Sequence, residues 1–158
     1  MNLSDIVVRG AIVPELASSE RDGVIAELLD ALLAAGVADR ASRDALLKAI
    51  LDREQKSSTG FGKGVAVPHV RHASVTKLSA AVGLSPRGID FSALDRQPVY
   101  SVFLLLSPAD KPDDHLQAME VIFKSLSNDV FRRFLRQATS VEDVVSLLDD
   151  ADGQNLPA

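Results

Sequence analysis

The chain has 158 residues, of which 46% are hydrophobic and 25% are charged, and its formal net charge is −5. This size and composition are typical of one globular domain with a sizeable core. The negative charge and the few aromatic residues argue against nucleic acid or anionic lipid as partners, because both favour a basic surface. No apolar run approaches the roughly 18–20 residues of a membrane span, and no signal-peptide pattern follows Met1.

The chain contains three histidines and no cysteine. Without cysteine it can form no disulfide and has no thiolate nucleophile, and we expect a cytoplasmic protein. The histidines are therefore the first candidates for nucleophilic chemistry.

The first third of the chain predicts one strand and two helices. Residues 6–13 are mostly apolar and predict a short strand. Ser19 and the acidic residue three positions later have the spacing of a capping box, which predicts a helix start. Apolar residues then repeat at helical spacing as far as Gly36, a residue type that commonly ends helices. A second amphipathic helix is expected from about Asp39 to residues 53–56.

The middle of the chain changes to apolar runs of strand length at 65–70, 78–84 and 99–106. The run 102–106 is apolar throughout, so we place it at the centre of a sheet, covered on both faces. Turn-forming residues bound the runs, at 62–64, 85–88, 95–98 and 107–110.

Helical spacing returns after Pro112. Ser140 begins a second capping-box pattern at the start of the last expected helix, and residues 151–158 are expected to form a flexible tail. Two apolar stripes precede that helix, one formed by Leu116, Met119, Ile122, Phe123 and Leu126 and the other by Phe131, Phe134 and Leu135.

This order of elements predicts an α/β fold in which a mixed β-sheet is sandwiched between helices. Helices both precede and follow the strands, so both faces of the sheet can be covered. The strands follow one another along the chain, which favours antiparallel pairs. We expect residues 1–150 to form a single domain.

The segment from Arg53 to His69 is the most informative part of the chain. It runs from a helix through a glycine-rich loop at 60–64 into a short strand that ends at Pro68 and His69. Pro68 restricts its own backbone and that of Val67, so His69 stands on a stiff support. A neutral imidazole is nucleophilic near pH 7 and can carry a phosphoryl group on a ring nitrogen. The alternative is that His69 only caps a strand.

Two further residues are candidates for the same site. His115 is expected in the exposed first turn of a helix, where the helix dipole favours a neutral imidazole and attracts anions. Arg53 ends the helix before the glycine-rich loop, and its planar guanidinium could bind phosphate oxygens through two hydrogen bonds. The alternatives are a solvated histidine and a helix-capping arginine. His72 is assigned no role.

Other motifs in the chain are weak. The loop at 60–64 contains Lys63 followed by glycine rather than Ser or Thr, and it follows a helix, so neither a P-loop nor a dinucleotide-binding fingerprint fits. A zinc site formed by His69, His72 and His115 is not supported by their spacing. We therefore expect neither a metal nor a cofactor.

The chain resembles the fructose/mannitol-type enzyme IIA domains of the bacterial sugar phosphotransferase system, a family that includes a nitrogen-related regulatory branch. The segment from residue 107 to His115 is similar to the family's segment with its second active-site histidine, and the order and length of the helices agree over nearly the whole chain. Three runs of this chain resemble the family's phosphorylation-site signature: Arg53-Glu54, Ser58-Thr59-Gly60 and Gly62-Lys63-Gly64-Val65-Ala66-Val67-Pro68-His69.

The resemblance implies a mixed sheet between helices and a transient phosphohistidine at His69. It implies that an HPr-type phosphocarrier, or its paralogue, donates the phosphoryl group and that a cysteine of an enzyme IIB partner accepts it during sugar uptake. Arg53 and His115 match the positions that surround the phosphoryl group, and the implied reaction needs no metal.

The resemblance has one departure and leaves two functions open. Relatives usually carry a small residue after the Pro-His pair, where this chain has Val70, Arg71 and His72, and this bulkier, more basic rim could alter the choice of partner. The first function is phosphotransfer in sugar uptake. The second is a stand-alone regulatory module whose phosphorylation state controls a binding partner. A small metal-binding domain is a third alternative.

Overall fold

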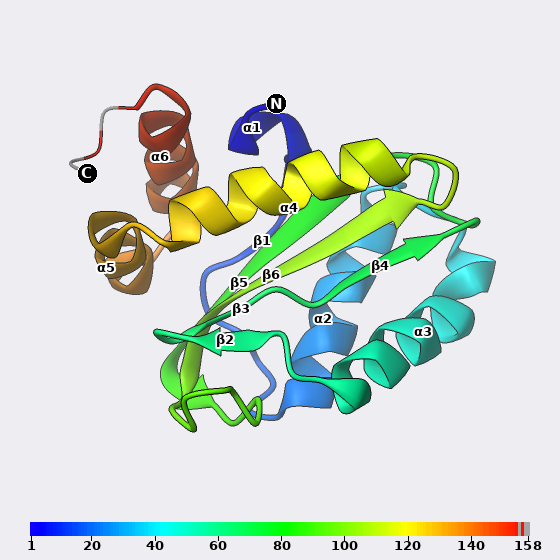
Figure 1. Ribbon diagram of the computed structural model, residues 1–158, viewed down its shortest axis with the longest axis horizontal. Helices are drawn as coiled ribbons and strands as arrows, with labels where there is room; N and C mark the ends of the chain where they lie inside the picture. Colours follow the sequence, from blue (N-terminus) through cyan, green and yellow to red (C-terminus); the bar gives the residue numbers. More distant parts are fainter. Residues whose placement is uncertain (155, 157–158) are drawn as a thin grey trace.

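A mixed β-sheet lies at the centre of the computed structural model, which describes residues 1–154 and 156 (Figure 1). The strand order is β1-β5-β6-β3-β2, and β4 also pairs with β6. The pairs β5–β6 and β2–β3 are antiparallel, whereas β1–β5, β3–β6 and β4–β6 are parallel. The strands are β1 (Val7–Val13), β2 (Gly60–Gly62), β3 (Val65–Ala66), β4 (His69–His72), β5 (Ser79–Ile89) and β6 (Val99–Pro108).

Helices cover both faces of this sheet, as the sequence predicts (Figure 1). The helices α2 and α3 pack on one face, and α1, α4, α5 and α6 pack on the other. Their bounds are α1 (Leu3–Ile6), α2 (Arg21–Ala34), η1 (Arg40–Ser42), α3 (Arg43–Lys56), α4 (Pro112–Leu126), α5 (Asp129–Gln137) and α6 (Val141–Asp152).

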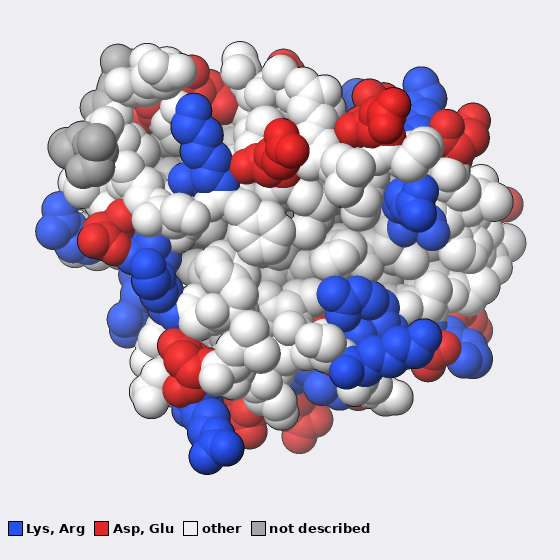
Figure 2. All heavy atoms as spheres, viewed as in Figure 1, with Lys and Arg blue, Asp and Glu red and all other residues white. Residues whose placement is uncertain are grey.

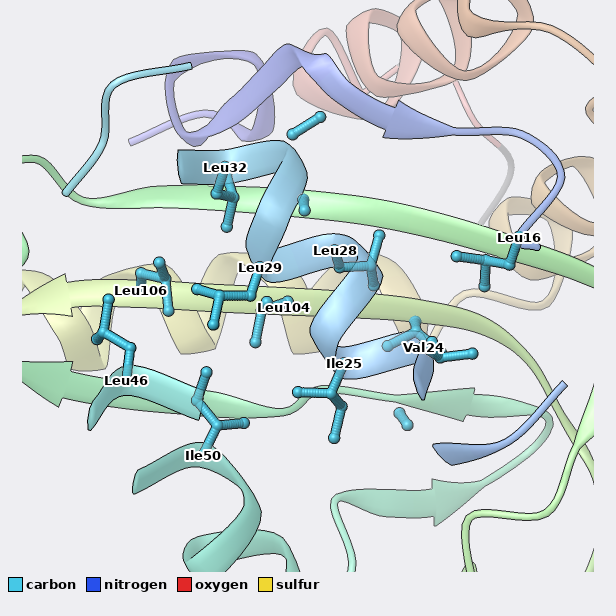
Figure 3. Close-up of a cluster of buried hydrophobic side chains, with 14 of the residues drawn as sticks. Leu16, Val24, Ile25, Leu28, Leu29, Leu32, Leu46, Ile50, Leu104 and Leu106 are labelled. Carbon is cyan, nitrogen blue, oxygen red and sulfur yellow. The ribbon is translucent and has the colours of Figure 1, made fainter. Parts of the chain in front are cut away.

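Strand β6 forms the centre of the core, and its expected burial on both faces is confirmed. Leu104 and Leu106 pack against leucine and isoleucine side chains of α2 and α3 (Figure 3). Phe103 and Leu105, which alternate with them, pack against the helices of the other face. Both faces of β6 are therefore apolar because each contacts a helical layer.

The strands near the candidate site differ from the sequence prediction. The run 65–70 is two strands, β3 and β4, because Pro68 lacks an N–H group and interrupts the ladder, while its carbonyl oxygen accepts from the Leu105 amide (2.9 Å). His69 therefore begins a strand instead of ending one. Part of the expected glycine-rich loop is the short strand β2. Residues 85–88 are not a turn, since they lie within β5 at an irregularity of its pairing with β6.

The helix boundaries follow the predicted signals in part. Gly36 follows the end of α2 with a φ of 81°, and the Ser140 side chain accepts from the Asp143 amide at the start of α6, as expected. The residue that caps α2 is Glu20 instead of Ser19, and the Glu20 side chain forms no capping hydrogen bond. The short helix α1 carries no sequence signal that we identified.

The apolar stripes predicted for α4 and α5 are partly wrong. Leu116 is 61% exposed and Phe134 is 47% exposed. In α4 the residues that face the sheet are His115, Ala118, Ile122 and Leu126. Ile122 and Leu126 belong to both sets, whereas His115 and Ala118 take the place of Leu116 and Met119 in the first half of the helix. The small side chain of Ala118 lets the helix approach the sheet, which spacing alone does not reveal.

The C-terminal helix extends beyond the expected domain boundary. It continues to Asp152, so residues 151 and 152 are helical. The Asp152 carboxylate accepts hydrogen bonds from the Leu3 amide (2.6 Å), the Ser4 amide (2.9 Å) and the Ser4 hydroxyl (2.7 Å). Helix α1 and the end of α6 therefore meet at this carboxylate. The expected tail also includes residues 155, 157 and 158, which lie outside the described residues.

Candidate functional site

The three residues selected from the sequence line one surface cleft. The cleft has a volume of about 480 Å³ and lies at the edge of the sheet formed by β4, between α3 and the start of α4. Arg53 comes from α3, His69 from β4 and His115 from α4. Its lining consists of Arg53, His69, Val70, Arg71, Pro112, His115 and Leu116.

His69 is half-buried at the first position of β4. Its Nδ1 lies 2.8 Å from the Val67 carbonyl oxygen. A carbonyl oxygen can only accept, so Nδ1 carries a hydrogen and donates it. In the neutral ring Nε2 then holds the lone pair and is the nucleophilic atom. The hydrogen bond to the backbone expected under the strand-capping alternative is thus present, and it also fixes the tautomer.

The surroundings of His69 favour the neutral ring. Burial lowers its pKa, and the Val67 carbonyl opposes this by stabilising the protonated ring. The Arg53 guanidinium lowers the pKa further, while the Glu54 carboxylate raises it. The net shift is downward, which increases the fraction of nucleophilic imidazole at neutral and mildly acidic pH.

His115 is buried, contrary to the exposed helix start expected from the sequence. It is 9% exposed, because it lies on the face of α4 that packs against the sheet. Its Nδ1 is 2.6 Å from the hydroxyl of Ser107, a buried residue of β6. Burial lowers its pKa to about 4, with smaller contributions from His69 and Arg71. His115 is therefore uncharged at neutral pH.

The hydrogen bond to Ser107 also selects the tautomer of His115. A serine hydroxyl can donate or accept, and we assign the Ser107 hydroxyl as the donor to Nδ1 of the neutral His115 ring. Nε2 of His115 then carries the ring hydrogen and is a donor. The two imidazole rings are neighbours, with centroids 5.5 Å apart and planes tilted by 48°. A nucleophilic nitrogen and a neutral donor therefore share the cleft.

Arg53 lies in the last turn of α3 and is exposed. Its Nη1 donates to the Ser57 carbonyl oxygen (2.9 Å), which is the helix-capping contact of the alternative interpretation. A guanidinium has five N–H groups, so this contact leaves most of them for an anion. Because it also lowers the pKa of His69, its charge acts on that ring.

The next residue, Glu54, was not assigned a role from the sequence. It is 2% exposed, and its carboxylate accepts from the Thr59 amide (2.7 Å) and the Thr59 hydroxyl (2.6 Å). The Thr59 carbonyl in turn accepts from the Val67 amide (3.3 Å). This chain of contacts connects α3 to the residue that orients His69. Ser107 and the Val67 carbonyl were also missed, since neither a turn-like Ser-Pro pair nor a backbone atom has a distinctive sequence signal.

His72 lies outside this arrangement. It does not line the cleft, and its Nδ1 is 2.7 Å from the Ser74 hydroxyl. No group of three or more His, Cys, Asp or Glu side chains in the described ranges, 1–154 and 156, is placed to hold a metal ion. Within the same ranges, no helix is long and apolar enough to cross a membrane.

The chain matches a known family over most of its length. The family model of the phosphoenolpyruvate-dependent sugar phosphotransferase system, EIIA 2, matches residues 6–151. The chain belongs to this family. This finding confirms the family resemblance, and the matched range includes the cleft residues Arg53, His69 and His115.

Individual relatives include both sugar-specific and regulatory proteins. The fructose-specific EIIA component of Haloferax volcanii is 38% identical over 94% of this chain and 97% of that protein. The fructose-specific EIIABC component of Bacillus subtilis is 32% identical over 96% of this chain, which spans only 24% of that protein. The crystal structure of nitrogen regulatory protein IIA-Ntr from Neisseria meningitidis has a TM-score of 0.81 and 28% identity, covering 91% of this chain and 97% of that one.

Proposed function

We propose that this EIIA-family chain is a phosphohistidine carrier of the phosphoenolpyruvate-dependent phosphotransferase system. An HPr-type phosphocarrier donates a phosphoryl group to His69, and an enzyme IIB of a fructose/mannitol-type transporter accepts it. One observation carries the proposal: the Val67 carbonyl holds Nδ1 of His69, so that Nε2 is the free nucleophile in a cleft shared with Arg53 and His115.

The proposed step uses these atoms as follows. The Nε2 lone pair of His69 attacks phosphorus, and the bond between phosphorus and the carrier breaks, leaving its electron pair on the carrier. Nδ1 keeps its hydrogen and its contact with the Val67 oxygen, so the positive charge that develops on the ring is next to a carbonyl dipole. Onward transfer reverses these changes, and the Nε2 lone pair is restored.

Arg53 and His115 stabilise the transferred group. The phosphoryl oxygens carry negative charge in the transition state, so catalysis rests on positioning and on groups that complement this charge. Arg53 supplies a permanent positive charge on the α3 side. His115, held by Ser107 as a neutral Nε2–H donor, supplies a hydrogen bond without adding positive charge next to the ring of His69.

The stand-alone regulatory function remains the second candidate. It is favoured by the similarity to a protein named as nitrogen regulatory, which covers nearly the full length of both chains. Both functions use the same phosphorylation site and differ in where the group goes. Rapid loss of phosphate to a fructose-type enzyme IIB would favour transport, whereas retention in the presence of IIB would favour regulation.

The test of the proposal is phosphorylation of the intact chain by phosphoenolpyruvate, enzyme I and each phosphocarrier in turn, followed by intact-mass measurement. We expect a gain of one phosphate that is stable at neutral pH and lost in acid. His69→Ala should abolish the gain, and His72→Ala, which changes a histidine outside the cleft, should not. Full labelling of the His69→Ala variant would contradict the proposal.

A further inference from the structure

The edge strand β4 places a second arginine beside the two histidines. Alternate residues of a strand point to the same face, so the side chains of His69 and Arg71 lie on one face of β4. In the parallel pairing with β6, His69 is opposite Leu105 and Arg71 is opposite Ser107. Ser107 holds His115. The register therefore brings Arg71 next to the contact that fixes the second histidine.

Arg71 is available to bind a ligand in the cleft. It lines the cleft and is exposed, and no carboxylate within residues 1–154 and 156 forms an ion pair with it. Its charge contributes to the lowered pKa of His115, whereas that of Arg53 contributes to the lowered pKa of His69. The two guanidinium groups thus approach the histidine pair from different elements.

We propose that Arg71 is a second phosphoryl-binding guanidinium, which contacts the transferred group from the β4 side while Arg53 contacts it from α3. The proposal rests on the proposed function and identifies a residue that the signature does not assign. A phosphoryl group in transfer presents three equatorial oxygens, with the attacking and leaving atoms in line above and below them. Arg53, His115 and Arg71 supply one donor group for each of these oxygens.

This assignment has a consequence that a solvated strand arginine would not have. Two guanidinium groups beside a phosphorylated His69 favour the dianionic over the monoanionic phosphoryl group. Removal of the Arg71 charge should therefore raise the pKa of the bound phosphoryl group. Besides Arg71 and the two histidines themselves, the charged groups that act on the pKa of His69 or His115 within the described residues are Arg53 and Glu54 of α3, and both stay in place when Arg71 is replaced.

The experiment is a ³¹P NMR pH titration of the phosphorylated chain. In Arg71→Gln the midpoint should rise by about half a pH unit or more, as expected for the loss of one charge at close range. The midpoint of Arg71→Lys, which keeps the charge, should lie close to that of the parent. The matched control is Arg87→Gln, because Arg87 is also an exposed strand arginine and lies outside the cleft. Its midpoint should not change.

Rates of transfer from the phosphocarrier provide a second readout. Arg71→Gln should lower kcat at least threefold, and Arg71→Lys should restore much of the loss. Normal labelling of Arg71→Gln with an unchanged titration midpoint would refute the role of Arg71 and leave the proposed function standing. A parent chain that takes up no phosphate would refute the proposed function, and the Arg71 assignment with it.

Discussion

Two histidines in the cleft have different chemical roles because their Nδ1 atoms have different partners. His69 donates to a carbonyl oxygen, which leaves Nε2 as a nucleophile. In the assigned tautomer, His115 accepts from a serine hydroxyl, which leaves Nε2–H as a donor. Histidine therefore supplies both a lone pair and a hydrogen to one small site. The Nδ1 partner, a backbone carbonyl or a serine hydroxyl, determines whether Nε2 of each ring is a lone pair or a donor.

The buried position of His115 makes folding stability dependent on pH. Its folded-state pKa of about 4 is below its ordinary value of 6.5, so the unfolded chain binds a proton more readily between these values. Stability from this group is present above pH 6.5 and is lost as the pH falls toward 4. We expect a loss of about 2 kcal/mol between pH 7.5 and pH 5.

Urea unfolding at these two pH values measures this effect. His115→Gln cannot take up the proton, so the variant should lose less stability than the parent by about that amount. Equal losses in the two proteins would show that His115 does not titrate below its ordinary range.

The sequence predicted the residues of the site better than their environment. The signature led to Arg53 and His69, the helix start after Pro112 led to His115, and all three residues line one cleft. Sequence spacing did not reveal that His115 is buried, because Leu116 and Met119 are more apolar than His115 and Ala118, which take the buried positions. It could not identify the Ser107 contact either, since this depends on the packing of α4 against β6.

At the scale of elements, Glu54 connects helix α3 to the segment before His69. Its buried carboxylate accepts two hydrogen bonds from Thr59, in the chain between α3 and β2. The strands β2 and β3 are only three and two residues long, so side-chain contacts contribute much of the order in this segment. The division into β3 and β4 was also not predicted, because a continuous apolar run does not show which strand pairs are formed.

Replacement of Glu54 tests this connection. Glu54→Ala leaves the buried Thr59 amide without its acceptor, and we expect a loss of about 1–3 kcal/mol in the free energy of unfolding. Thr59→Val removes only the hydroxyl contact and serves as the comparison, with a smaller loss. If the two variants lose the same stability in urea titrations, the amide contact with Glu54 contributes nothing.

At the scale of the whole molecule, the helical layers and the sheet place the cleft on an open edge. Basic side chains lie near this edge in the view of Figure 2, although the chain as a whole is acidic. In the proposed function, this edge position leaves the phosphoryl group on His69 accessible to the protein partners. The sandwich itself was predictable from the order of helices and strands, because each apolar strand face needs a helical cover.

The contact between α1 and the end of α6 was not predicted. The sequence places residue 152 in a tail, whereas the Asp152 carboxylate accepts three hydrogen bonds from Leu3 and Ser4. Asp152→Ala should lower the free energy of unfolding by about 1–2 kcal/mol. Asp150→Ala is the matched control, since Asp150 is an exposed aspartate of the same helix with no hydrogen bond to α1. Thermal or urea unfolding that ranks the two variants equally would contradict this role of Asp152.

The central claim is that Nε2 of His69 carries the phosphoryl group while Nδ1 stays bonded to the Val67 carbonyl. NMR of the ¹⁵N-labelled chain, recorded before and after phosphorylation, tests it directly. We expect the free protein to show the Nδ1–H tautomer at His69 and the phosphorylated protein to show phosphorus coupling to Nε2 of the same ring. Coupling to Nδ1, or to a ring nitrogen of another histidine, would contradict the account.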